Sequence, residues 1–283
     1  MSSNSGVLYV VATPIGNLGD ISSRAIEVLS SVDVIAAEDT RTAKKLLSLL
    51  NIKQSCIAYH EHNEDRQINT IKSYLDRGES VALVSDAGTP LISDPGYPLV
   101  HSLRQQDYTV IPIPGVSAII TALSVSGIAT DRFTFEGFLS AKSTARKKQI
   151  AIIKNEPRTL VFYESCHRIQ ASLDDFCEVL GRDRKATVCR ELTKKFETIK
   201  HGSLADLCDW VRLSKQQKGE FVIVISGNTE QHDPDIEQAK GTIRVLLEYL
   251  GPSQAAAATA QLSGLKKKVL YEIALEIQNN DQS

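Results

Sequence analysis

The stretch VALVSDAGTPLISDPG, residues 81–96, decides how the rest of the chain is interpreted. It opens with four apolar residues, Val81–Val84, which are short and β-branched enough to predict a buried strand. A dense turn region with two glycines follows at once, and glycine permits the positive φ angles that tight turns need. In an open α/β sheet, ligands bind beyond the carboxyl ends of the strands, where this loop would lie. The stretch therefore predicts either a strand with two tight turns or a strand with a ligand-binding loop.

Composition places the chain among ordinary globular proteins. Its 283 residues allow two compact domains and a small appendage, and its net charge of −2 means that any nucleic-acid binding must rest on local patches. No apolar run approaches the roughly 20 residues that cross a bilayer, and we see no secretory signal, so we expect a cytoplasmic protein without a membrane partner. Five cysteines without a Cys-x-x-Cys pair favour free thiols over disulfides or a metal site.

Strand and helix patterns alternate along residues 6–115, which predicts a parallel α/β sheet. The strands are expected at residues 7–12, 34–37, 56–59, 81–84 and 109–113. Neither Gly-x-Gly-x-x-Gly after the first strand nor a Gly-x4-Gly-Lys-Ser/Thr loop is present, so a common nucleotide-binding domain fits poorly. From Phe133 onward, strand succeeds strand more often, and we expect a mixed, partly antiparallel sheet there.

The last part of the chain changes to an all-helical pattern after a linker at residues 227–234. Three helices are expected, with Ser253 as the N-cap of the middle one and Lys266-Lys267-Lys268 in the first turn of the third. This order resembles a helix-turn-helix. Three lysines at a helix N-terminus oppose the helix dipole, so they predict either phosphate contact or a solvated charge run on a small bundle. We expect domains at 1–118, 119–230 and 236–283.

Several segments, in the same order along the chain, match one family. They are VATPIGNLGDIS (11–22), AAEDTRT (36–42), YHEHNE (59–64), VSDAGTPLISDPGYPLV (84–100), PIPGVSA (112–118), FYESCHRI (162–169), CRELTKKFE (189–197), GEFVIVI (219–225) and the tail QAAAATAQLSGLKKKVLYEIAL (254–275). Together they resemble the ribosomal small-subunit RNA 2′-O-ribose methyltransferase I family, within the tetrapyrrole (corrin/porphyrin) methylase superfamily.

The resemblance implies an α/β fold class with two domains of the tetrapyrrole-methylase type, a cofactor cleft between them, and a small helical appendage. It implies a homodimer that uses S-adenosylmethionine to methylate the ribose of a cytidine in the decoding region of small-subunit (16S) rRNA, either naked or in the assembled subunit. Two alternatives stay open: a methylase of a small planar or other non-RNA acceptor on the same fold, and a non-enzymatic nucleic-acid-binding protein.

The same resemblance implies the cofactor site. The positions carried over, with Asp86 beside them, are Pro14, Asp86, Ala87, Gly88, Thr89, Ile92, Ser117, Ala118, Glu164, Arg190 and Glu191. The chain departs from many relatives at Thr89, where they have Asp, and at Glu164, where they have Met. These departures bear on how the methionine end is held and on how the acceptor is handled.

Methyl transfer to a 2′-hydroxyl favours a positioned base and nearby carboxylates, because the hydroxyl is a weak nucleophile. Glu38 and Asp39 follow a predicted strand, and we expect one of them to be the catalytic base or orienter; the alternative for Asp39 is to cap the next helix. Candidates for RNA contact are Arg41, His60, Glu61, Arg168 and Lys194, with Arg146 and neighbouring lysines as a basic track. Candidates for base stacking are Tyr59, Tyr163 and Phe196, each of which could equally be core.

Overall fold

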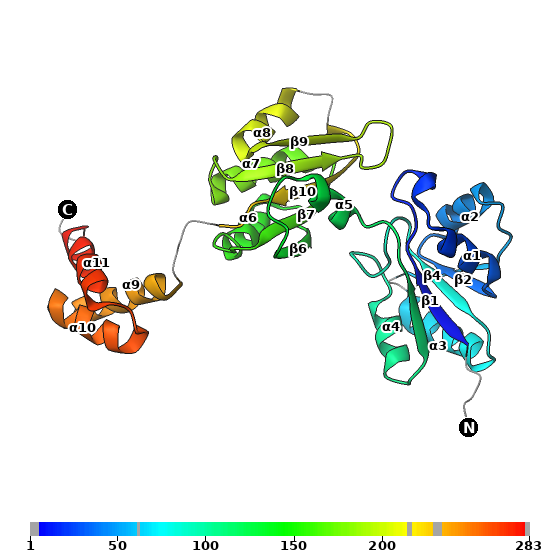
Figure 1. Cartoon of the computed structure of the whole chain (residues 1–283), viewed down its shortest axis with the longest axis horizontal. Coiled ribbons are helices and arrows are strands. Elements are labelled where there is room, and N and C mark those ends of the chain that lie inside the picture. The colour runs from blue at the N-terminus through cyan, green and yellow to red at the C-terminus, as the bar shows by residue number, and fades with distance from the viewer. Residues whose placement is uncertain (1–5, 61–62, 214–216, 229–233, 281–283) are drawn as a thin grey trace. The chain divides into compact units, whose positions relative to one another are not determined.

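The computed structural model describes residues 6–60, 63–213, 217–228 and 234–280. It divides the chain into two compact units, Met1–Ser226 and Gly227–Ser283. Two five-stranded sheets with their helices form the first unit, and three helices form the second (Figure 1). No helix in these described ranges is long and apolar enough to cross a membrane.

The first sheet has the strand order β3-β2-β4-β1-β5, and every neighbouring pair is parallel, as the alternation of patterns predicted. Its strands are β1 Val7–Val11, β2 Val34–Ala37, β3 Cys56–Ala58, β4 Val81–Val84 and β5 Thr109–Ile113. The central strands β2 and β4 are buried along their whole length, because helices cover both faces of the sheet. Helices α1 Ser23–Ser31 and α2 Thr40–Leu49 pack on one face, and α3 Glu64–Asp76 and α4 Tyr97–Arg104 pack on the other.

The carboxyl ends of these parallel strands carry the polar loops of the sequence analysis to one edge of the sheet. The loops after β1 and β4 are joined by a short antiparallel bridge: the Thr13 and Gly88 amides each donate to the other residue's carbonyl, at 2.8 and 3.0 Å. The loops after β1 and β4 are therefore fixed to one another by hydrogen bonds within the chain, without the help of a ligand.

The second sheet is mixed, which confirms the expectation for the region after Phe133. Its order is β6-β7-β10-β8-β9, with β6 and β7 parallel and all other pairs antiparallel. The strands are β6 Phe133–Phe138, β7 Thr159–Ser165, β8 Lys185–Arg190, β9 Thr198–Ser203 and β10 Glu220–Ile225. Helices α6 Ser143–Ile152, α7 Ile169–Leu180 and α8 Leu204–Leu213 pack on one face, and α5 Ala118–Val125 packs on the other.

The expectation that Arg146 belongs to a surface basic track is wrong. Its side chain is 1% exposed, and its guanidinium pairs with Asp175 at 2.6 Å and donates to the Ser140 and Ala141 carbonyls. A buried charge needs such partners, because leaving one unpaired in the interior costs several kcal/mol. Arg146 therefore holds α6 against α7 and is closed to an outside ligand.

The second unit consists of α9 Pro234–Leu247, α10 Pro252–Ser263 and α11 Lys267–Asn280 around a small apolar core that includes Ile243, Ala256 and Leu270. Ser253 is not the N-cap of α10: Gly251 occupies that position, and Pro252 takes the first helical turn, where its missing N–H costs nothing. The helix ends at Gly264, whose φ of 73° is the left-handed conformation of a typical C-cap.

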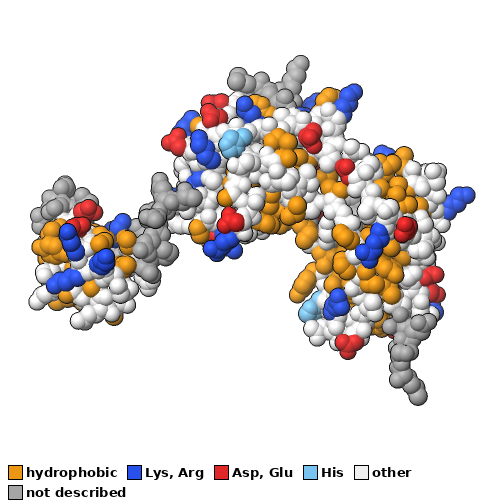
Figure 2. Space-filling model, viewed as in Figure 1, with side chains coloured by type: hydrophobic (Ala, Val, Ile, Leu, Met, Phe, Trp, Pro, Cys, Tyr) orange, Lys and Arg blue, Asp and Glu red, His pale blue; other side chains and the backbone are white. Residues whose placement is uncertain are grey.

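Lys266, Lys267 and Lys268 are exposed at the start of α11. Figure 2 shows Lys and Arg side chains beside apolar ones on the visible face of this unit. Part of the linker expected at 227–234 lies outside the described residues.

Candidate active site

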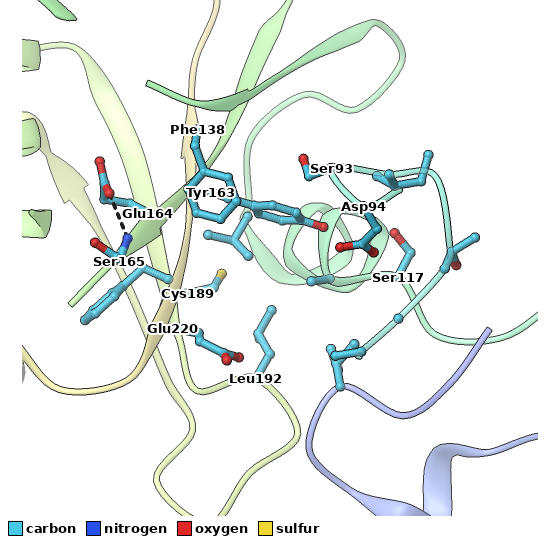
Figure 3. Close-up of a pocket in the computed structure, with 18 residues that line it drawn as sticks. Ser93, Asp94, Ser117, Phe138, Tyr163, Glu164, Ser165, Cys189, Leu192 and Glu220 are labelled. Carbon is cyan, nitrogen blue, oxygen red and sulfur yellow. Dashed lines mark hydrogen bonds between the residues drawn. The ribbon is translucent and has the colours of Figure 1, made fainter. Parts of the chain in front are cut away.

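A cavity of about 320 Å³ opens between the loop after β4, the start of α5 and four strands of the second sheet (Figure 3). Its walls are mostly apolar, with a few polar groups, which is typical of small-molecule sites. Most of the predicted cofactor positions line it: Ala87, Gly88, Thr89, Ile92, Ser117, Ala118 and Glu164. The remaining ones, Pro14, Asp86, Arg190 and Glu191, are not part of the lining.

The β4 loop approaches the cavity with its backbone. Gly88 has a φ of +78°, and a Cβ there would lie 3.3 Å from the Cγ2 of Ile15. The Thr89 hydroxyl donates to the Val116 carbonyl at 3.1 Å, so this side chain ties the loop to the segment before α5. Thr89, one of the two departures expected from the family pattern, therefore has a structural partner within the chain.

Asp94 is an acidic side chain in the cavity wall that the sequence analysis did not select. Burial, together with the negative charges of Glu38 and Asp86, raises its pKa to about 6, against a hydrogen bond with Ser85 that lowers it. Ser85, Asp86 and Asp94 all belong to residues 81–96, whereas Glu38 directly follows β2. The raised pKa of Asp94 therefore depends on the fold, and no local sequence pattern predicts it.

Glu38, Asp39 and Asp86 interlock at the edge of the first sheet. The Asp86 amide donates to Glu38 Oε2 at 3.3 Å, and the Asp39 amide donates to Asp86 Oδ1 at 3.2 Å. The Asp39 carboxylate accepts from the Arg41 amide at 2.8 Å and from its guanidinium at 2.7 Å, and it is the N-cap of α2. Hydrogen bonds from Arg41 lower the pKa of Asp39 to about 2. Capping, the alternative for Asp39, is thus confirmed, and neither Asp39 nor Glu38 lines the cavity.

Glu164 lines the cavity, but only 4% of the residue is exposed, and its carboxylate points away from Asp94 (Figure 3). It accepts from the Ser172 hydroxyl at 2.5 Å and the Ser165 amide at 2.7 Å, and pairs with Arg168 at 3.0 Å. Arg168, a predicted RNA contact, also donates to the Leu139 carbonyl. Glu164 and Arg168 therefore connect the end of β7 to Ser172 in α7 and to the segment at Leu139.

Lys194, another predicted RNA contact, pairs with Glu191 at 2.9 Å and Glu220 at 2.8 Å. Its aliphatic part covers the loop after β1, since a Cβ on Gly16 would lie 2.3 Å from Lys194 Cγ. Arg190 donates to the Lys218 carbonyl at 2.6 Å.

The other predicted RNA contacts lie at the first sheet. The Arg41 side chain is 90% exposed beside Asp39, and His60 contacts Asn63 through its backbone and ring. Glu61 lies outside the described residues.

Comparison with known proteins shows which families this chain is similar to. Residues 7–208 match the family model of Tetrapyrrole (Corrin/Porphyrin) Methylases, and residues 233–278 match the RsmI C-terminal HTH domain. The Ribosomal RNA small subunit methyltransferase I of Xylella fastidiosa (strain Temecula1) is 50% identical over 270 residues, covering 95% of this chain and 99% of that protein. The protein of that name from Vibrio cholerae is also 50% identical, over 274 residues that cover 95% and 94% of the two chains.

The chain belongs to the ribosomal RNA small subunit methyltransferase I family. It is a methyltransferase, and the resemblance found in the sequence is confirmed. The crystal structure of diphthine synthase superposes with a TM-score of 0.60 at 15% identity, covering 79% of this chain and 91% of the other, and supports the fold alone. The predicted fold class, with a helix-turn-helix appendage, is confirmed as well.

The aromatic candidates of this methyltransferase I family member divide among core, cavity and exposed surface. Tyr59 is fully buried, and its hydroxyl donates to Glu64 at 3.2 Å, so the core alternative is confirmed for this residue and stacking is excluded. Tyr163 lines the cavity, and burial and the charge of Asp94 raise its pKa. Phe196 is exposed, with Lys195 Nζ 5.7 Å from its ring centre, but lies outside the lining. Phe138 lines the cavity and was not selected, because its orientation depends on a strand irregularity that alternation does not reveal.

Among the described residues, no three His, Cys, Asp or Glu side chains come together as a metal site would require.

Proposed function

We propose that this methyltransferase uses S-adenosylmethionine to methylate the ribose 2′-hydroxyl of a cytidine in the decoding region of small-subunit rRNA. The observation that carries the proposal is the similarity, over nearly the full length of both chains, to proteins named Ribosomal RNA small subunit methyltransferase I. The proposal extends to a cytoplasmic homodimer that acts on naked rRNA or on the assembled small subunit. The cavity supports it through its size and the raised pKa of Asp94.

The residues around the cavity fit S-adenosylmethionine. The backbone at Gly88 forms part of the wall, and its positive φ favours glycine there. Ser117 is the N-cap of α5 without a side-chain cap bond, so the start of this helix offers N–H donors to a carboxylate. Apolar side chains such as Leu192 and Val222 offer contact to an adenosine. When bound, the cofactor would supply a methyl group on a positively charged sulfur.

In this proposal Asp94 accepts the proton of the attacking 2′-hydroxyl. A general base works best when its pKa lies near the operating pH, and about 6 satisfies this while leaving the group ionised at pH 7. Asp39, with a pKa of about 2 and its carboxylate bound to Arg41, is a weak base. We therefore assign the base to Asp94, and we assign to Glu38 a positioning role, since its charge raises the pKa of Asp94.

RNA contact would come from exposed cations. Arg41 is paired with Asp39 but its side chain is exposed, as are the lysines that open α11. Lys194 and Arg168 are also paired with carboxylates, and their side chains are mostly buried. Phosphate contacts supply most of the affinity for nucleic acid without reading sequence. In the proposal, Lys194 and Arg168 shape the site, and the exposed cations bind the rRNA backbone.

Transfer of a tritiated methyl group tests the proposal. Small ribosomal subunits from cells lacking the enzyme, naked rRNA and a porphyrinoid would be offered in parallel, and the labelled nucleotide would be mapped. Label on one cytidine ribose, lost in Asp94→Asn, is the expected result. Label on a base, or only on the porphyrinoid, would overturn the assignment of the acceptor.

A further inference from the structure

Strand β6 contains one residue more than its partner β7 along the wall of the cavity. Phe135 pairs with Val161 and Phe138 pairs with Tyr163, so three steps on β6 match two steps on β7. Gly137, inside this bulge, has a φ of +64°, which glycine adopts without strain. Bulges re-aim side chains and occur preferentially beside functional sites.

The extra residue decides which way Phe138 faces. Side chains alternate along a regular strand, so Phe135 and Phe138, three residues apart, would lie on opposite faces of the sheet. Because of the bulge, both rings contact Tyr163, with ring centres 4.8 Å away for Phe135 and 5.5 Å away for Phe138. Tyr163 is thereby fixed between two aromatic neighbours, and its hydroxyl points toward Asp94 (Figure 3).

Phe138 lines the cavity, yet 53% of it remains exposed. Leaving so much aromatic surface in contact with water sacrifices the free energy that its burial would contribute. Ring contacts and the bulge nevertheless hold it at the cavity, on the same wall as Tyr163 and across from Ser93 and Asp94. The arrangement is that of an aromatic surface prepared for a ligand.

We propose that Phe138 is the platform on which the base of the target nucleotide stacks when its ribose enters the cavity. This inference rests on the proposed function and adds the residue that holds the acceptor. An enzyme acting on one nucleotide must take it out of its stack, and an aromatic ring replaces the lost stacking. Base and 2′-hydroxyl belong to neighbouring carbons of one ribose, so a base on Phe138 keeps the hydroxyl on the side of the cavity that holds Asp94.

The test replaces the ring and keeps an apolar side chain. Phe138→Leu is compared with Phe133→Leu, a matched control on the same strand: Phe133 is 38% exposed and lies outside the cavity lining. Phe138→Trp tests rescue by another aromatic ring. Rates of tritiated methyl transfer give KM for small ribosomal subunits, calorimetry gives Kd for S-adenosylmethionine, and light scattering gives the oligomeric state.

We expect Phe138→Leu to lower kcat/KM for subunits about 10- to 100-fold, in keeping with base–aromatic stacking, with Kd for the cofactor and the oligomeric state unchanged. Phe138→Trp should restore most of the loss, and Phe133→Leu should behave as the wild type.

Three results for Phe138→Leu would overturn the proposal while leaving the proposed function intact. They are an unchanged kcat/KM, a loss of cofactor affinity as large as the loss of kcat/KM, or dissociation of the enzyme into monomers. The first would leave the ring without a role in transfer, the second would place Phe138 against the adenosine, and the third would place it in a subunit interface. Failure of the wild-type enzyme to label any ribose would instead overturn the proposed function.

Discussion

The carboxyl group of Asp94 sits in the cavity wall with a pKa of about 6, so its charge changes within the working range of an enzyme. Burial and the neighbouring charges of Glu38 and Asp86 disfavour its ionised form in the folded protein. The unfolded chain has no such penalty, because there the carboxyl group is surrounded by water. Catalytic competence and stability therefore have opposite requirements at this residue.

Asp94→Asn should abolish methyl transfer and raise the free energy of unfolding at pH 8 by about 1 kcal/mol, because water screens the charge of this half-buried group and reduces what the pKa shift alone would give. The pKa of Asp94 is higher in the folded state, so the wild type loses stability as pH rises from about 4 to about 6. The Asp94→Asn variant has no ionisable group at this position and does not lose this stability. Thermal unfolding at pH 8 and pH 4 would measure this, and the difference between the two proteins should shrink at pH 4. If Asp94→Asn were less stable than the wild type at pH 8, the raised pKa of Asp94 would be contradicted.

Glu38→Gln should move the acidic limb of the pH–rate profile to lower pH. Removing a nearby negative charge makes ionisation of Asp94 easier and lowers its pKa. The measurement is kcat/KM for subunits between pH 5 and pH 9. Asp39→Asn is the matched control, since its charge is not among those that raise the pKa of Asp94, and Asn also caps helices well. If Asp39→Asn removed activity as fully as Asp94→Asn, the base would be Asp39.

Among the elements, β6 combines a structural cost with a proposed role. Gly137 holds a left-handed backbone at the bulge, and a Cβ added there would have only the Ser93 hydroxyl nearby, at 3.8 Å. A substitution at this position meets backbone strain and almost no collision. The same holds for Gly127, which has a φ of +68° and nothing within 4 Å of such a Cβ.

Gly137→Ala should destabilise the protein by about 1–2 kcal/mol and lower kcat/KM for subunits, because relaxing the bulge displaces Phe138. Gly127→Ala should cost similar stability and leave the kinetics alone. Denaturant unfolding and methyl-transfer rates would be measured for both variants. Equal kinetic losses in the two would mean that general destabilisation is responsible, and the bulge would have no part in substrate binding.

Most elements were predictable because the central strands are short apolar runs followed by turn residues, as at Val81–Val84. The site was predictable only where a local pattern marks it, as in the glycine-containing β4 loop. Asp94 was missed because its pKa depends on Glu38, which is far away in the sequence. Phe138 was missed because a bulge cannot be deduced from alternation.

At the scale of the whole molecule, a net charge of −2 gives rRNA no general attraction, so local cations must supply it. The lysines that open α11 are exposed and stand where the helix dipole disfavours them. A feature that is unfavourable for the helix itself is more easily understood if it serves binding. The helical unit would then contribute affinity, and the two sheets would contribute the chemistry.

Replacing Lys266, Lys267 and Lys268 together by Gln should raise KM for subunits and flatten its dependence on salt, with the slope of log KM against log salt falling by up to about 2. The helix should become slightly more stable, because cations leave its positive end. Kinetics at several salt concentrations and thermal unfolding would be measured. Glu272→Gln with Glu276→Gln on the same helix is the control, and an unchanged salt slope in the triple variant would exclude phosphate contact.

The bulge in β6 also makes the pairing register of this strand a determinant of what the cavity can recognise. Deleting Gly137 would let β6 pair with β7 as a regular strand, and the ladder would survive the loss. Phe138 would then stand two residues after Phe135 and would keep its pairing with Tyr163, so it would stay on the cavity side of the sheet. The aromatic surface would be lost only if Gly137 stayed in the chain and β6 paired without the bulge, because Phe138 would then turn to the face covered by α6 and α7.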